Sequence, residues 1–384
     1  MSFAPAAQHI QESAALRALR ADVRAFIREE IASGGFVPAV DCWLNSWDEA
    51  FSRRLAARGW LGMTIPVEYG GHGRTFLERF VVTEELLAAG APLAAHWISD
   101  RQIGPSLMKF GSGEQRRKLL PGIATGEVFF AIGMSEPDSG SDLASVRTKA
   151  VKVDGGWHLT GSKIWTSGAH RSHWFIVLAR SAPLDPEHRH AGLSQFIVAL
   201  DSPGIDIRPI VSMNGHHHFN QVFFDNVFVP DAMLLGREGD GWKQVTSELS
   251  YERSGPERLL STVAVLSEMA SATQRGDLAP DPELGRTFAR IMALHQMSVS
   301  VADALSSGRP TDQEAAIVKV LGTATEGDVA ELASLSVATG QADDGLARLR
   351  EMTATALLSR PGFTLRGGTN EILRGVIARG LGLR

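Results

Sequence analysis

Cysteine is almost absent from this chain, since Cys42 is the only one among 384 residues. A single thiol excludes a disulfide within the chain and a metal site built from cysteines, and it suits a reducing compartment. No apolar run is long enough to span a bilayer, and residues 1–13 lack the charged and apolar regions of a signal peptide. We therefore expect a cytoplasmic protein with no membrane insertion.

The chain also lacks a strong excess of charge of either sign. Its 38 basic and 43 acidic residues are well mixed and give a formal net charge of -5. Without a basic stripe there is no surface of the kind that a phosphate backbone needs, so we do not expect nucleic acid as a partner. The hydrophobic share of 44% is typical of a globular protein, and the length permits two or three domains that share a large core.

The periodicity of apolar residues changes twice along the chain. From Glu12 to about Gly122 apolar residues recur at helical spacing, and the run from Ser112 to Gln115 has the spacing of a capping box, so that Gly111 should separate two helices. From Gly239 onward the helical period returns. Both ends of the chain are therefore predicted to be helical.

The middle of the chain is predicted to consist of short strands. Its runs rich in Val, Ile, Phe and Trp cover residues 129–134, 149–153, 157–166, 173–180, 194–201 and 220–229. The sequence Asp154-Gly155-Gly156 between two of these runs is a tight hairpin signal. Many strands without helices between them indicate an antiparallel sandwich or barrel, and a dinucleotide fingerprint is absent. We expect an α+β protein with a helical domain at 1–125, a β domain at 126–232 and a helical bundle at 233–384.

Several motifs have ordinary structural explanations when they stand alone. The run "SEPDSGSD" from Ser135 to Asp142 is what a polar turn looks like. Glu252 and Arg253 on a helix are most often a solvated or ion-paired couple. The three histidines from His216 to His218 point to alternate faces of a strand, so they cannot converge on one metal ion, and we expect no metal site.

Taken together, the motifs resemble those of the acyl-CoA dehydrogenase family of flavoenzymes. The resemblance covers nearly the whole chain and rests on "GMSEPDSGSD" from Gly133, "GSKIWTSG" from Gly161, "ELSYERSGPERLL" around Glu252 and "RGGTNEILRGVIARGLGLR" from Arg366. It implies the fold described above, an FAD cofactor and an enzyme of lipid metabolism that introduces an α,β-double bond into an acyl-CoA thioester.

The resemblance also implies roles for individual residues around FAD. Hydroxyl groups at Ser135 and Ser141, the backbone near Met134, the ring of Trp165 and the hydroxyl of Ser167 would hold the flavin. Thr369 would contact its pyrophosphate end. In the family a neighbouring subunit completes the site; here Phe288 keeps that role with Arg286 beside Gly285, and the family's glutamine segment is reduced to "GQADDG", with Asp343 and Asp344.

The catalytic base is expected to be Glu252. Most of the family carries a glutamate where this chain has Gly367, and Gly-Gly-Thr in this place resembles a large bacterial branch that includes steroid-side-chain enzymes. Residues 241–253 align without gaps with the helix on which a minority of the family places its base. Because Pro256 cannot bond the carbonyl of Glu252, we expect a helix kink there. The Gly367 N–H would bind the thioester oxygen.

The substrate and the partners are predicted less narrowly. Arg253 would bind substrate, and His96 and Trp97 fall where the family lines its acyl pocket, although core packing explains them equally well. An electron-transferring flavoprotein is the expected electron acceptor, and a homodimer or homotetramer the expected assembly. Two alternatives stay open: a flavin monooxygenase or oxidase of the same fold, and a partner subunit of a heteromeric dehydrogenase.

Overall fold

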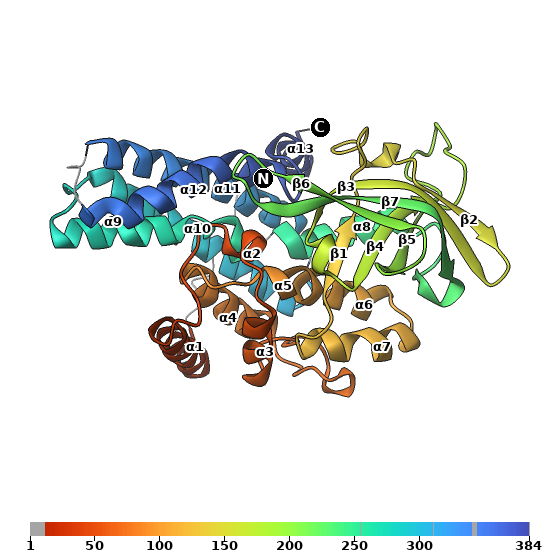
Figure 1. Ribbon diagram of the computed structural model, residues 1–384, viewed down its shortest axis with the longest axis horizontal. Helices are drawn as coiled ribbons and strands as arrows, with labels where there is room; N and C mark the ends of the chain where they lie inside the picture. Colours follow the sequence, from red (N-terminus) through yellow and green to blue (C-terminus); the bar gives the residue numbers. More distant parts are fainter. Residues whose placement is uncertain (1–11, 254, 310, 340–343, 384) are drawn as a thin grey trace. The chain divides into compact units, whose positions relative to one another are not determined.

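The computed structural model describes residues 12–253, 255–309, 311–339 and 344–383, with backbone only for 248–253 and 344. Helices occupy the first and last parts of the chain and strands the middle, so the predicted α+β fold is confirmed (Figure 1). The helices are α1 (Ala14–Ala32), α2 (Cys42–Asn45), α3 (Glu49–Ala57), α4 (Phe76–Ala88), α5 (Ala94–Ile98), α6 (Gly104–Phe110), α7 (Gly113–Ala124), α8 (Gly241–Arg253), α9 (Val263–Arg275), α10 (Pro282–Ser306), α11 (Asp312–Thr339), α12 (Ala347–Leu365) and α13 (Asn370–Gly380).

The strands form one eight-stranded sheet with the order β6-β7-β3-β2-β4-β5-β8, and β1 pairs with β4. They are β1 (Phe130–Gly133), β2 (Lys149–Val153), β3 (Gly156–Ser167), β4 (Trp174–Arg180), β5 (Leu193–Ala199), β6 (Ile205–Val211), β7 (His217–Pro230) and β8 (Leu234–Leu235). Most pairs are antiparallel, as predicted, but β1 and β4 run parallel. The predicted hairpin joins β2 to β3, where Gly155 has φ +71°, a value that suits glycine.

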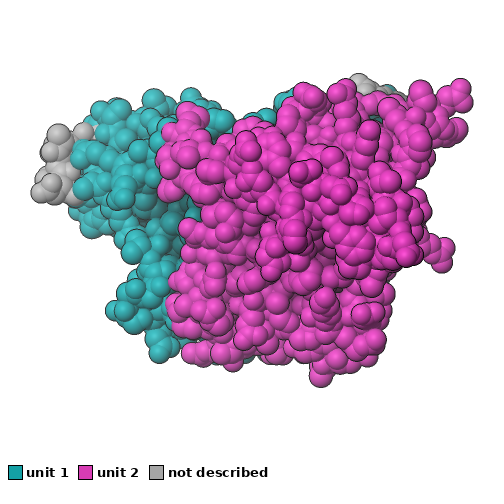
Figure 2. All heavy atoms as spheres, turned by 45° about the vertical axis from the view of Figure 1, so that its right-hand side comes forward, with its two compact units in different colours: residues 1–46, 75–93, 252–384 teal, residues 47–74, 94–251 magenta. Residues whose placement is uncertain are grey.

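Two compact units make up the chain, coloured separately in Figure 2. Unit 1 combines residues 1–46, 75–93 and 252–384, and unit 2 combines residues 47–74 and 94–251. The division does not follow the order of the sequence, because helical segments from both ends share unit 1. Of the helices before the sheet, α1, α2 and α4 belong to unit 1, while α3, α5, α6 and α7 belong to unit 2.

Unit 1 is a helical unit built on long helices. In Figure 1, α10, α11 and α12 run side by side, and α11 also contacts α9 and α13. α1 packs on α4 through its apolar stripe, which includes the buried Val23, Phe26 and Ile27. A spacing of three or four residues puts these side chains on one face of the helix, and this face is buried in the core of the unit.

Unit 2 is built around the sheet. Its hydrophobic core contains aromatic side chains of the strands, among them Phe130, Phe175, Phe196 and Phe224, together with helix residues such as Leu120. The capping box predicted at Ser112 and Gln115 is confirmed at the start of α7. Within the described residues, no helix is long and apolar enough to cross a membrane.

Candidate functional residues

A buried ion pair fastens the loop after β1 to the sheet. The Lys163 ammonium lies 2.8 Å from the Glu136 carboxylate and donates to the Met134 carbonyl oxygen at 3.1 Å. Glu136 also accepts the backbone N–H groups of Arg147 and Thr148 at 2.7 and 2.8 Å. Burial alone would raise the pKa of Glu136, but Lys163 and these hydrogen bonds hold it below the usual value, whereas burial lowers the pKa of Lys163 to about 8. Both ends of the loop are thus fixed to β3.

The loop after β1 and the end of β3 carry three serine hydroxyl groups without a partner in the described part of the protein. The hydroxyl groups of Ser135, Ser141 and Ser167 form no hydrogen bond within the part of the chain that the structure describes. Ser135 uses its backbone carbonyl, which accepts the N–H of Ile164 at 2.9 Å. Each of the three hydroxyl groups can therefore donate to a ligand or accept from one.

Trp165 stands at a bulge in β3. The strand pairs Lys163 with Val222 and Thr166 with Asn220, so two residues of β3 face one residue of β7. Trp165 has φ +59°, an uncommon conformation for a bulky residue, and its side chain is 55% exposed. A bulge redirects a side chain. Here it leaves an indole ring whose centroid lies 5.6 Å from that of Phe219, edge to face, while more than half of the residue stays exposed.

Buried polar contacts maintain the bulge. The fully buried Asn220 donates to the Thr166 carbonyl at 3.0 Å, and the Thr166 hydroxyl donates to the Asn220 carbonyl at 2.8 Å. Rings of His170 and His217 stack at 4.0 Å and both contact the Asn220 side chain. Burial, with His217 and Arg171 nearby, lowers the pKa of His170 to about 4, so its ring is neutral at pH 7.

These residues of unit 2 fit the flavin of FAD. A flavin needs directed hydrogen bonds at its polar edge and an apolar wall on one face. The three unbonded hydroxyl groups supply the first, and the open indole face of Trp165 supplies the second. No group of three or more His, Cys, Asp or Glu side chains that could hold a metal ion is found among the described residues.

A second group of predicted residues lies in unit 1, on the turn between α12 and α13. Gly367 and Gly368 have φ of +70° and +84°, and Thr369 caps α13 by accepting the Ile372 N–H at 3.3 Å. Buried Lys319, on α11, donates to the carbonyl oxygens of Thr364 and Gly368. Two successive left-handed residues explain the pair of glycines, since any other residue would be strained there.

The prediction of a kink at Glu252 is wrong. α8 ends at Arg253, Gly255 is extended with φ -79° and ψ 164°, and Pro256 begins a 3₁₀ turn, Pro256–Arg258. A proline disfavours the helical conformation of the residue before it, so the helix stops instead of bending. The side chains of Glu252 and Arg253 lie outside the described residues, as do Asp343 and the side chain of Asp344.

The remaining predicted residues lie in two places. On α10, Phe288 is 38% exposed and Arg286 is exposed and paired with Glu283. In unit 2, His96 and Trp97 are buried; His96 Nδ1 lies 2.8 Å from the Ser52 hydroxyl, and Arg101 lies over the Trp97 ring. Burial lowers the pKa of His96 to about 4, an effect that Asp100 partly offsets.

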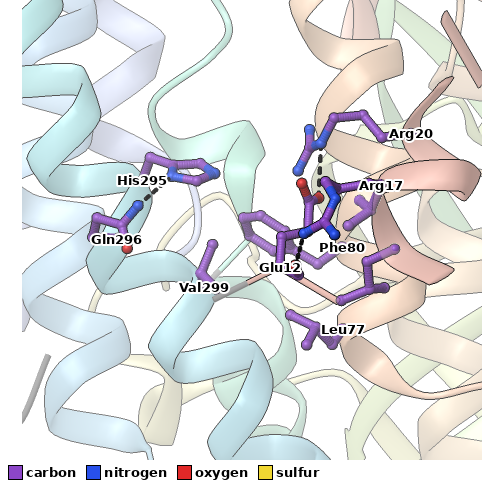
Figure 3. Close-up of a pocket in the computed structure, with 10 residues that line it drawn as sticks. Glu12, Arg17, Arg20, Leu77, Phe80, His295, Gln296 and Val299 are labelled. Carbon is purple, nitrogen blue, oxygen red and sulfur yellow. Dashed lines mark hydrogen bonds and ion pairs between the residues drawn. The ribbon is translucent and has the colours of Figure 1, made fainter. Parts of the chain in front are cut away.

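None of the predicted residues lines the cavity of about 470 Å³ shown in Figure 3. This cavity lies within unit 1 between α1, α4 and α10. Figure 3 shows Arg20 beside Glu12, to which it is bonded at 2.9 Å, and Arg20 also pairs with Glu84 at 2.8 Å. Because these carboxylates already neutralise Arg20, the cavity does not offer it to an anionic ligand.

Comparison with known proteins shows which family the chain belongs to. The chain matches the family models of the acyl-CoA dehydrogenase N-terminal domain over residues 13–127, middle domain over 131–227 and C-terminal domain over 239–382. The chain belongs to the acyl-CoA dehydrogenase family. It is accordingly an FAD-dependent oxidoreductase.

Three similar proteins illustrate the relationship. IpdE1 of Mycobacterium tuberculosis is 35% identical over 350 residues, 87% of each chain, and FadE34 of the same organism is 34% identical over 332 residues, 85% of this chain. The chain spans 45% of the length of FadE34. Among solved structures, the Tcur3481-Tcur3483 steroid ACAD is 32% identical, with a TM-score of 0.84 over 97% of this chain and 99% of that one.

Sequence reasoning missed the buried charges that support the predicted residues in each unit. Glu136 lies inside the recognised motif, and Lys163 lies two residues before Trp165, but neither had been assigned a role. Lys319 and Asn220 were missed as well, because charged and amide side chains are mostly exposed and a sequence pattern does not mark the buried exceptions. The apolar neighbours of Lys319, Val318 and Val320, and the Ile164 that follows Lys163 are the signals that the sequence offered.

Proposed function

We propose that this acyl-CoA dehydrogenase family member converts an acyl-CoA thioester into the trans-2-enoyl-CoA. The observation that supports this most is the exposed indole of Trp165 in the same unit as three unbonded hydroxyl groups, which suits a flavin. FAD, when bound, supplies the acceptor for the hydride that leaves the β-carbon. The chain itself binds and aligns the thioester, takes up the α-proton and keeps water away from the ring face.

Glu252 is the proposed base, and Arg253 is proposed to bind substrate. The turn from Arg366 to Thr369 contains no carboxylate, so a base has to come from elsewhere. Glu252 is the penultimate residue of α8, directly before the backbone leaves the helix. A carboxylate at a reactive centre takes up the α-proton, and the electron pair of the broken α-C–H bond forms the new double bond as the β-hydrogen leaves as hydride.

The Gly367 N–H is proposed to donate to the thioester oxygen. Removing an α-proton drives negative charge onto that oxygen, and a fixed N–H stabilises the charge as it develops. Thr369 is proposed to contact the pyrophosphate end of FAD. Its oxygen accepts from Ile372, which leaves the hydroxyl hydrogen available to donate to a phosphate oxygen.

For the acyl group we propose a bulky substrate of the kind handled by the Gly-Gly-Thr branch. The support is the sequence Gly367-Gly368-Thr369 and the 32% identity to a protein named as a steroid ACAD. His96 and Trp97 are the residues proposed to line the acyl pocket. A panel of short, branched and steroid-side-chain acyl-CoA thioesters, assayed with an artificial electron acceptor, tests the function. If no thioester of the panel is turned over, or if the reduced flavin consumes oxygen rapidly, the monooxygenase or oxidase alternative is favoured.

An oligomer completed by the C-terminal helices is also proposed. Phe288 and Met292, one turn apart on α10, are 38% and 59% exposed, and Leu335, Leu357 and Leu358 add exposed apolar surface on α11 and α12. Apolar surface that gathers on neighbouring helices is typical of an interface. In this assembly Arg286 and Phe288 would reach the FAD of the neighbouring subunit. Analytical ultracentrifugation that shows an FAD-bound monomer would contradict the proposal.

The partner of that interface decides the second candidate function. The similar steroid ACAD carries two protein names, which favours testing whether this chain works with a different subunit. A chain purified alone that is yellow and active supports a homo-oligomer, with an electron-transferring flavoprotein as the acceptor to be tested. A colourless chain that takes up FAD only with a second protein would support the partner-subunit alternative.

A further inference from the structure

The direction of the Gly367 N–H depends on the two residues that flank it. α12 ends at Leu365, Arg366 is extended with φ -76° and ψ 151°, and the next two residues are left-handed. The peptide plane that contains this N–H is set by ψ of Arg366 and φ of Gly367. Two glycines in series have a wide choice of conformations, so contacts outside the turn have to select one of them.

On one side, Asp41 holds Arg366. The carboxylate of Asp41 accepts two hydrogen bonds from the Arg366 guanidinium, at 2.7 and 2.8 Å, and the guanidinium lies over the ring of Trp43 at 4.5 Å. Asp41 is itself fixed, since its N–H donates to the Ser261 carbonyl at 2.8 Å. A two-point contact of this geometry sets the orientation of a guanidinium as well as its position.

On the other side, Lys319 holds Gly368. The fully buried ammonium donates at 2.8 Å to the Gly368 carbonyl, at 3.0 Å to the Thr364 carbonyl and at 2.8 Å to the Asn370 side chain. The three acceptors come from the end of α12, the turn and the start of α13. The Lys319 side chain therefore fixes the end of α12, the start of α13 and the Gly368 carbonyl relative to one another.

We propose that Asp41 and Lys319 are positioning residues that together set the direction of the Gly367 N–H. This inference rests on the proposed function, in which that N–H donates to the thioester oxygen. Neither residue touches substrate in this scheme. Their effect is to fix the N–H before the substrate arrives, so that no reorganisation is needed when charge develops on the oxygen.

The test uses the FAD-bound enzyme with the variants Asp41→Asn, Arg366→Lys and Lys319→Met, and Arg360→Met as the matched control. Arg360 lies on α12 six residues before Arg366, but its ion pair with Glu331 is exposed. The first readout is hydrogen exchange of peptides that cover residues 362–372, measured by mass spectrometry. We expect exchange to rise by about tenfold or more in Asp41→Asn and Lys319→Met and to stay unchanged in the control.

The second readout is the infrared band of the thioester carbonyl in the 1-¹³C-labelled enoyl-CoA product of an acyl-CoA that the enzyme accepts, bound to the oxidised enzyme. A hydrogen bond to this oxygen lowers the band frequency relative to the same enoyl-CoA free in solution. We expect Asp41→Asn to return the band toward the free value, and kcat on the accepted acyl-CoA to fall about 10- to 100-fold with KM changed less than about threefold. Arg366→Lys, which keeps the charge, should recover part of both effects.

The outcomes separate the two claims. If the unmodified enzyme shows no band shift, the thioester contact of Gly367 is wrong, and the positioning role falls with it. If the enzyme shows the shift and Asp41→Asn and Arg366→Lys keep it in full, the contact stands and the positioning role is overturned. Should Lys319→Met fail to fold because three acceptors lose their donor, the two variants at the ion pair decide the question alone.

Discussion

Asp41 and Arg366 lie 325 residues apart in the sequence and form a two-point ion pair at 2.7 and 2.8 Å. Their side chains are only 4% and 16% exposed. Removing one partner of such a pair leaves a charge without compensation and costs roughly 3–5 kcal/mol. The pair connects the segment before α2 to the turn before α13, so the conformation of that turn depends on residues near the start of the chain.

Glu326 should make the stability of unit 1 depend on pH. Burial raises the pKa of this carboxyl group to about 7, partly offset by Arg366 and by hydrogen bonds from Ser261, while Asp41 raises it further. Since the folded pKa exceeds the unfolded value, the contribution is fully present below about pH 4.5 and is lost as pH rises to about 7. Glu326→Gln should remove that decline, roughly 3 kcal/mol in the free energy of unfolding. Urea denaturation at several pH values measures it, and equal slopes for both proteins would contradict the prediction.

His96 should make the free energy of unfolding fall toward low pH, in a pH range that overlaps with that of Glu326. Its folded pKa of about 4 lies below the unfolded value of about 6.5, so the unfolded chain takes up the proton first and stability falls as pH drops through this range. His96→Gln should flatten the loss, again by roughly 3 kcal/mol at most. A His96 variant whose profile matches that of the unmodified protein would show that the ring is not held neutral.

Glu136→Gln should weaken FAD binding without touching the ligand. The change leaves the buried Lys163 ammonium without its carboxylate and releases the loop that carries Ser135 and Ser141. We expect the Kd for FAD to rise at least about tenfold, and the double variant Glu136→Gln/Lys163→Met to recover part of the lost stability because it removes the uncompensated charge. Asp138→Asn, in the same loop but 81% exposed, is the control for fluorescence titration with FAD. Equal Kd values for the two loop variants would rule out this role.

Glu252→Gln should separate binding from chemistry. The amide keeps the size of the side chain but cannot accept the α-proton, so FAD content and thioester affinity should persist while flavin reduction slows by about 10²–10⁴-fold. Stopped-flow absorbance on a confirmed substrate measures the rate. Glu257→Gln is unsuitable as a control because Glu257 is buried, whereas Glu371→Gln removes an exposed carboxylate from α13. A loss of only a few fold in Glu252→Gln would mean that another group is the base.

The elements that sequence could predict were those with a strong local pattern. Apolar periodicity located the helices of both ends and six of the strands, and the hairpin and capping box followed from short motifs. β6 was missed because Asp206, Arg208 and Pro209 interrupt its apolar pattern, which an edge strand of the sheet tolerates. The parallel pairing of β1 with β4 was not visible either, since it depends on contacts distant in sequence.

For the functional residues, too, the sequence predicted what a local motif marks and missed what depends on the fold. The candidate flavin residues came from motifs that lie within a few neighbouring residues, and their roles stay predictions, as do the three domain boundaries. The supports of the site could not be predicted, because Lys163 and Lys319 read as ordinary surface lysines until the fold buries them. The kink expected from Pro256 shows a further limit: a proline marks an interruption of the helix, and the residues around it decide whether the helix bends or ends.

The division of the chain into two units has a consequence for its synthesis. Unit 2 draws on residues no later than Tyr251, whereas unit 1 requires the segment that begins at Glu252. A chain emerging from the ribosome can therefore close the sheet unit early, while the surface of α4 that packs on α10 waits uncovered until the last third of the protein has been translated. During that interval this apolar surface of α4 is open to contacts that the folded protein does not make.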